Sequence, residues 1–110
     1  MPLPPLPLVH GTLDLLVLRT LSAGAMHGYG IALAVHERTG GDFAIEDAAL
    51  YQALHRLDAR GFVDAQWRAS DNNRRARYYT LTASGRKRLR EEAANWRRYS
   101  RAVDAVLQGA

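Results

Sequence analysis

The chain has 110 residues, no cysteine and a formal net charge of +4. Its length suits one domain with a modest core, and the lack of cysteine excludes disulfides, thiolate metal ligands and thiol nucleophiles. The charge is unevenly spread, because residues 1–55 hold two arginines against five acidic residues, whereas residues 56–101 hold thirteen Lys and Arg against five. A basic surface of this kind points to a polyanionic partner.

The N-terminal segment 1–10 is apolar and carries prolines at positions 2, 4, 5 and 7. It lacks the basic start of a signal peptide, and its prolines would break a signal-peptide helix, so we expect a flexible Pro-rich tail. The next apolar stretch is interrupted by Asp14 and Arg19 and is shorter than the ~18 residues that a membrane span needs. We therefore expect a cytoplasmic protein that does not enter the membrane.

Two helices are predicted in the first half of the chain. The first starts with Thr12 as its N-cap and ends before the turn "SAGAMHG", and its apolar residues cover more than one face. A helix of that kind is buried on several sides. The second runs from about His27 to Thr39 and is stopped by Gly40 and Gly41, which tolerate a left-handed conformation.

The third predicted helix starts with Asp47 as its N-cap and ends at Gly61. Its apolar stripe consists of Leu50, Leu54 and Leu57 at i, i+4 and i+7. The opposite face is polar and partly basic, with Tyr51 at its margin, and consists of Ala48, Ala49, Gln52, His55, Arg56 and Ala59.

A β-hairpin is predicted next, from the segments "FVDAQWR" and "ARYYTL", which are rich in β-formers. Alternation places Val63, Ala65 and Trp67 on one side of the first strand. The polar, turn-prone loop "ASDNNRR" joins the strands, so the hairpin has an arginine-rich tip. One of Tyr78 and Tyr79 belongs to the core and the other to the outer face, and the alternation does not decide which.

The last and longest helix is predicted to start with Thr82 as its N-cap and to run to about Leu107. Apolar residues recur along it at intervals of seven and form a narrow seam of Leu89, Ala93, Trp96, Tyr99 or Ser100, Val103, and Val106 or Leu107. A seam on a terminal helix needs a partner, so we expect a homodimer. The alternative is that the seam packs only on its own domain.

Three helices followed by a two-stranded ribbon are the element order of a winged helix-turn-helix, in which the third helix enters the major groove of DNA. We predict a fold that is mainly α with a small β-hairpin, with a DNA-binding domain over residues 11–82 and a dimerisation helix over residues 83–110. An unrelated small α+β domain would share the element order but would not need arginines at the hairpin tip.

Several separated segments resemble the PadR family of transcriptional regulators, namely "GTLDLLVLRTL", "HGYGIA", "LYQALHRLDARGFV", "NNRRARYYTLTASG" and the trailing Trp-bearing helix. The resemblance covers nearly all of residues 9–107. It implies a winged-helix head, one C-terminal helix that completes a homodimer, and regulators that commonly repress and are released by phenolic compounds or drugs. Ala48, Ala49 and Gln52 depart from the family, whose members often have Gly-Ser or Gly-Thr before the Leu-Tyr and proline after it, which leaves the base preference open.

The candidate contacts to double-stranded DNA fall into two groups. Guanidinium forks on the wing match phosphate geometry, and the long polar side chains of the third helix reach base edges, with Gln favouring adenine and Arg favouring guanine. For Tyr29, a phosphate contact and packing against the third helix are both open. The full set is Tyr29, Ala48, Ala49, Tyr51, Gln52, His55, Arg56, Asn72, Asn73, Arg74, Arg75 and Arg77.

The predicted seam also bears on partners. Pairing of two seams would place two recognition helices about one DNA turn apart, which predicts a palindromic site. The predicted interface residues are Leu89, Ala93, Trp96, Tyr99, Val103 and Leu107. Trp96 in the middle either flanks a cavity for a small aromatic effector or serves only as an interface anchor.

Enzyme motifs are missing from the sequence. There is no Gly-x-Ser-x-Gly and no phosphate-binding loop, and "HERTG" lacks the second histidine of a zinc protease helix. We expect neither a metal nor a cofactor. The preferred function is a DNA-binding repressor, and the alternative from another class is a basic dimeric module that binds a protein and has no operator.

Overall fold

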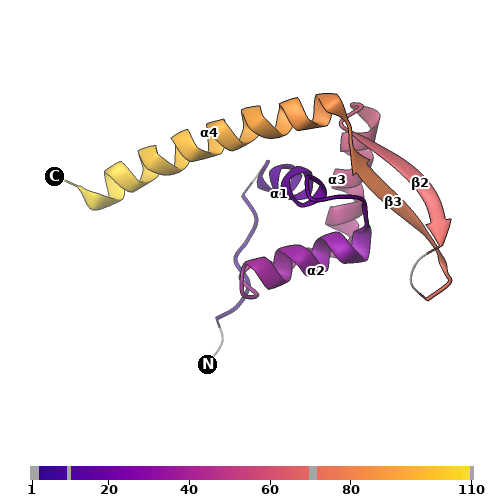
Figure 1. Ribbon diagram of the computed structural model, residues 1–110. Helices are drawn as coiled ribbons and strands as arrows, with labels where there is room; N and C mark the ends of the chain where they lie inside the picture. Colours follow the sequence, from indigo (N-terminus) through magenta and orange to yellow (C-terminus); the bar gives the residue numbers. More distant parts are fainter. Residues whose placement is uncertain (1–2, 10, 70–71, 110) are drawn as a thin grey trace.

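The computed structural model describes residues 3–9, 11–69 and 72–109. Within these residues, four helices and a small three-stranded antiparallel sheet confirm the expected fold class (Figure 1). In chain order the elements are α1 (Thr12–Leu21), β1 (Met26–His27), α2 (Gly28–Arg38), α3 (Asp47–Ala59), β2 (Val63–Ala69), β3 (Arg75–Leu81) and α4 (Ala83–Gln108).

The sheet has the strand order β1-β3-β2. Strands β2 and β3 form the predicted hairpin, in a register that runs from Val63 opposite Leu81 to Ala69 opposite Arg75. Strand β1 lies outside the sequence prediction, because two residues are too short to show any periodicity. It pairs with β3 through His27 opposite Tyr78, which ties the start of α2 to the wing.

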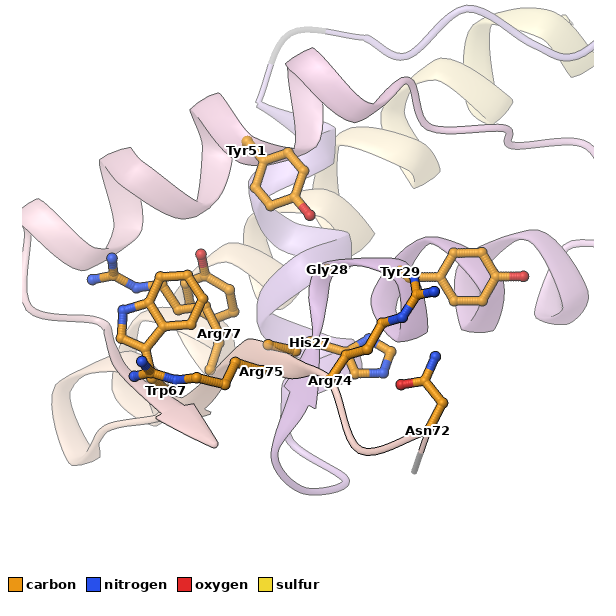
Figure 2. Close-up of a pocket in the computed structure, with 11 residues that line it drawn as sticks. His27, Gly28, Tyr29, Tyr51, Trp67, Asn72, Arg74, Arg75 and Arg77 are labelled. Atoms are coloured by element: carbon orange, nitrogen blue, oxygen red, sulfur yellow. The ribbon is translucent and has the colours of Figure 1, made fainter. Parts of the chain in front are cut away.

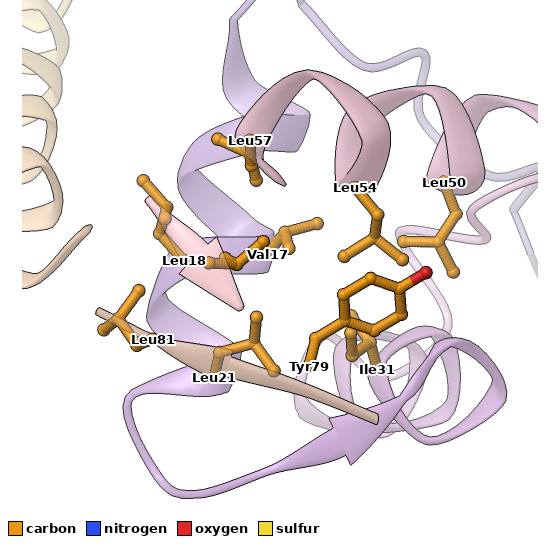
Figure 3. Close-up of a cluster of buried hydrophobic side chains, with 10 residues drawn as sticks. Val17, Leu18, Leu21, Ile31, Leu50, Leu54, Leu57, Tyr79 and Leu81 are labelled. Atoms are coloured by element: carbon orange, nitrogen blue, oxygen red, sulfur yellow. The ribbon is translucent and has the colours of Figure 1, made fainter. Parts of the chain in front are cut away.

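The core lies where α1, α2, α3 and the inner face of the hairpin meet (Figure 3). The predicted stripe of α3 is buried there, and Tyr79 proves to be the inner tyrosine of the pair. Each large apolar side chain buried in this way stabilises the fold by roughly 1.5–3 kcal/mol. The cluster consists of Val17, Leu18, Leu21, Ile31, Leu50, Leu54, Leu57, Val63, Tyr79 and Leu81.

Two predicted helix caps are wrong. The N-cap of α1 is Gly11, whose φ of 84° lets the chain enter the helix from a left-handed conformation, and Thr12 is the first helical residue. The N-cap of α3 is Glu46, so Asp47 lies in the first turn, where its charge still favours the helix dipole. Neither helix start has a side-chain capping hydrogen bond, and Gly11 has no side chain that could form one.

Helix α4 begins as predicted, with the Thr82 hydroxyl accepting a hydrogen bond from the Gly85 N–H at 3.0 Å. The same hydroxyl donates to the carbonyl oxygen of Gly61 at 2.7 Å, and Ser84 donates to that oxygen at 2.9 Å. The start of α4 is therefore bonded directly to the turn that follows α3. From there α4 passes α1 and projects beyond the head (Figure 1).

The described part of the N-terminal segment, residues 3–9, lies beside the head. The Leu6 N–H donates a hydrogen bond to the Asp42 carbonyl at 2.8 Å. The remainder of the predicted tail, residues 1, 2 and 10, lies outside the described residues. Across the described chain, no helix combines the length and apolarity that crossing a membrane requires.

Candidate nucleic-acid interface

A cleft of about 680 Å³ opens between the start of α2, helix α3 and the wing (Figure 2). Arginines of the wing and several aromatic or imidazole rings face it, and among the described residues no acidic side chain does. The cleft therefore suits an anionic partner that is long enough to reach from helix to wing. Its lining consists of His27, Gly28, Tyr29, Tyr51, Trp67, Asn72, Arg74, Arg75, Ala76, Arg77 and Tyr79.

The inner face of the hairpin carries both core and cleft residues. Side chains alternate along a strand, so Trp67 follows Val63 and Ala65 on this face, as predicted. The strands extend past the helices, however, and Trp67 is 58% exposed. The guanidinium groups of Arg75 and Arg77 lie over its ring, 5.5 and 5.9 Å from the centroid. This cation–π arrangement holds two arginines toward the cleft, and the sequence pattern did not place Trp67 in the site.

Arg77 also contacts helix α3. Its Nη2 lies 3.7 Å from Oδ2 of Asp58 in α3, and both side chains are partly exposed. A pair of this kind contributes at most about 1 kcal/mol, but it connects the wing to α3. Tyr79 also lines the cleft, and burial raises the pKa of its hydroxyl above the ordinary value.

Tyr51, and not Tyr29, packs between α2 and α3. A Cβ added to Gly28 would lie 3.0 Å from the Tyr51 hydroxyl, so this ring approaches the backbone closely. Tyr29 is 73% exposed, and Figure 2 shows its ring pointing away from α3. Packing of Tyr29 against α3 is therefore not observed, and a phosphate contact by its hydroxyl stays a prediction.

The outer face of α3 presents the predicted candidates next to the cleft. Ala48, Gln52 and His55 are exposed, and Ala49 is half-buried. Arg56 is exposed as well but is engaged, because its Nη2 lies 2.8 Å from Oδ1 of Asp14 in α1. Gln52 and His55 are thus the long side chains that this face presents most directly to a ligand.

The described part of the wing tip is exposed. Asn73 has a φ of 61°, a left-handed conformation that asparagine tolerates in turns. Asn72 and Arg74 line the cleft beside Arg75. The middle of the predicted loop, residues 70 and 71, lies outside the described residues.

The seam of α4 changes character along its length. Leu89 and Ala93 are partly buried, and both line a groove of about 300 Å³ together with Leu15 of α1. Packing on the same chain therefore accounts for the first part of the seam. Trp96 is 41% exposed and stacks on Tyr99 at 5.9 Å between ring centroids, and the exposed apolar side chains continue through Val103, Val106 and Leu107.

The fold and the cleft define a winged helix-turn-helix protein of the DNA-binding class, and comparison with known proteins names its family. The model of the transcriptional regulator PadR-like family matches residues 17–91. The chain belongs to this family, whose members are transcriptional regulators and not enzymes. Within the described residues, no group of three or more His, Asp or Glu side chains is arranged to hold a metal ion.

Solved structures of similar proteins agree with this assignment. A PadR family transcription regulator from Clostridium difficile is 27% identical, with 88% of this chain and 99% of that chain covered and a TM-score of 0.77. A PadR family transcriptional regulator from Eggerthella lenta is 28% identical, with 91% and 85% covered and a TM-score of 0.77. A PadR-like transcriptional regulator from Bacillus cereus is 25% identical, with 91% and 95% covered and a TM-score of 0.77.

Proposed function

We propose that this protein is a repressor that binds a palindromic operator as a homodimer and is released by a small aromatic effector. The observation that carries the proposal is that Tyr51 lines both the basic cleft and the hollow formed by Gln52, His55 and Arg56 on α3, so the two surfaces adjoin. A duplex lying against that face would place a phosphate backbone along the wing, where Arg74 and Arg75 face the cleft. Repression needs only that the dimer occupies its operator, so it is the simplest activity that this surface supports.

The proposed DNA contacts divide into backbone and base contacts. The wing, through Asn72, Asn73, Arg74, Arg75 and Arg77, contacts phosphates and contributes affinity. Helix α3 contributes specificity through base edges. The base contacts come from Gln52 and His55, and from Arg56 once its ion pair with Asp14 is broken. The other three residues, Ala48, Ala49 and Tyr51, approach the DNA backbone or a thymine methyl group.

The proposed dimer is supported by the apolar residues that α4 leaves exposed in the single chain, from Trp96 to Leu107. Because Thr82 and Ser84 bond the start of α4 to Gly61, pairing of two α4 helices would also set the separation of two α3 helices. Two identical helices related by a two-fold axis require a palindromic operator.

The proposed effector site lies beside Trp96 and Tyr99. These stacked rings line a groove of about 360 Å³ with Leu15 of α1 and with Glu92 and Asn95 of α4. Flat aromatic molecules stack on such rings, and the polar side chains orient them. A Trp67→Phe variant leaves Trp96 as the single tryptophan, so quenching of its fluorescence by a phenolic acid or a planar dye measures binding directly.

The test of DNA recognition uses labelled duplex DNA from the promoter region of the protein's own gene. We expect a complex that survives excess scrambled duplex but is displaced by the unlabelled promoter fragment. Equal displacement by both competitors would contradict an operator in that fragment. It is also the result expected if the basic dimer serves to bind another protein.

A further inference from the structure

His27 is an unusual helix cap. Its Nδ1 accepts a hydrogen bond from the Gly30 N–H at 3.0 Å, and its extended backbone, with φ −83° and ψ 169°, is that of an N-cap residue. Serine, threonine, aspartate and asparagine are the residues that usually fill this position. Capping alone therefore does not explain an imidazole here.

The cap determines where the imidazole carries its proton. A neutral imidazole has one N–H donor and one acceptor nitrogen. Since Nδ1 accepts from Gly30, the neutral ring carries its hydrogen on Nε2. The capping bond does not use Nε2, so the Nε2–H can donate a hydrogen bond to a ligand.

The ring is also held in one orientation. Tyr78 contacts it edge-on, with 5.2 Å between ring centroids, and the pairing of β1 with β3 places the two residues opposite each other. On its other side the ring lies close to the start of α2, since a Cβ added to Gly30 would be 3.4 Å from Nδ1. His27 and Arg74 both line the cleft (Figure 2). The direct pairing with Tyr78 puts the His27 ring on the outer face of the sheet, whereas Trp67, Arg75 and Arg77 lie on the inner face.

We propose that His27 is a DNA backbone-binding residue, in which the capping bond fixes Nε2–H as a neutral donor for a phosphate oxygen in this cleft. The inference rests on the proposed DNA-binding function of the cleft and adds a contact of a different chemical kind. An arginine that meets a phosphate releases a counterion, whereas a neutral donor does not. The contribution of His27 to affinity is therefore independent of salt concentration.

Two substitutions separate the role of Nε2–H as a donor to DNA from the role of Nδ1 in capping α2. In His27→Asn the shorter amide still caps α2 but does not reach the position of Nε2. In His27→Gln the amide nitrogen reaches about as far as Nε2, while the residue is a poor cap. We expect His27→Asn to keep the melting temperature and to lose affinity, and His27→Gln to lose about 4–8 °C and to keep most of the affinity.

The salt dependence of binding gives the sharper result. At about pH 8, affinities for the promoter duplex are measured between roughly 50 and 200 mM salt. We expect His27→Asn to bind about tenfold more weakly at every concentration, with an unchanged slope of log K against log salt. Arg75→Ala, in the same series, is expected to flatten the slope.

Results that differ from these expectations would overturn the His27 contact, its neutral form or the cleft as the DNA site. Unchanged affinity in His27→Asn while Arg75→Ala weakens binding would remove the His27 contact and leave the cleft in place. A flattened slope in His27→Asn would mean that His27 binds as a cation. If affinity follows melting temperature in both variants, His27 is a cap and no more. If neither His27→Asn nor Arg75→Ala changes binding, the cleft itself is not the DNA site.

Discussion

Arg56 of α3 and Asp14 of α1 form an ion pair in which Nη2 lies 2.8 Å from Oδ1. Arg56 is thereby bonded to α1, while it still lines the outer face of α3 beside Gln52 and His55. Helix α1 also lines the groove beside Trp96, through Thr12 and Leu15. The pair therefore connects the proposed effector groove with the proposed base-reading helix.

Substituting Asp14 should release Arg56 to DNA. For Asp14→Asn we expect tighter binding to nonspecific duplex and a salt slope that is steeper by about 0.9, as for one further neutralised phosphate. The free energy of unfolding should fall by no more than about 1 kcal/mol, because the pair is partly exposed. Glu37→Gln on α2 is the control for the change in net charge. Equal increases in affinity and salt slope in the two variants would show that Arg56 does not reach the duplex.

The wing arginines should account for much of the salt dependence. The double substitution of Arg74 and Arg75 by alanine is expected to weaken binding to the promoter duplex and to reduce the salt slope by about 0.9 for each phosphate that is no longer neutralised. Fluorescence anisotropy over a salt series measures both quantities. Arg101→Ala, near the end of α4, is the control for the effect of removing an arginine elsewhere. An unchanged affinity and slope in the wing variant would exclude the wing as a backbone-binding element.

A charge in the middle of the α4 seam should prevent dimerisation. Trp96→Arg would bury a guanidinium in an apolar interface without a partner, and sedimentation velocity is expected to show a monomer. Ala94→Arg adds the same charge on a different face of the same helix and should leave the dimer intact. A dimeric Trp96→Arg variant would contradict the proposed interface.

The close approach of α4 to the head makes Gly85 sensitive to substitution. A Cβ at this position would lie 2.0 Å from the Phe62 carbonyl oxygen and 2.8 Å from Leu81 Cδ1. Backbone must move to admit it, so Gly85→Ala should lower the free energy of unfolding by about 1–3 kcal/mol or more in urea denaturation. Wild-type stability in this variant would be inconsistent with the observed junction between α4 and the turn after α3.

Local patterns in the sequence determined most of the elements and several details of the site. The spacing of Leu50, Leu54 and Leu57 identified the buried face of α3. The exposed residues of α3 could therefore be assigned to its opposite face. Thr82 was recognisable as a cap from its position before a long amphipathic stretch. The hairpin and the arginines of its tip followed from β-formers around a polar loop. These are properties of neighbouring residues, so they can be seen without knowing how the elements pack.

Only the tertiary structure decided which of these residues meet. Asp14 and Arg56 are 42 positions apart, and their contact depends on how α1 docks against α3. Tyr79 shares the buried face of β3 with Leu81, which leaves Tyr78 as the outer tyrosine, opposite His27. The length of the wing left Trp67 exposed beyond the core. The caps at Gly11 and Glu46 were likewise visible only in the backbone conformation. Contacts of this kind arise from the packing of whole elements, which periodicity along the chain does not encode.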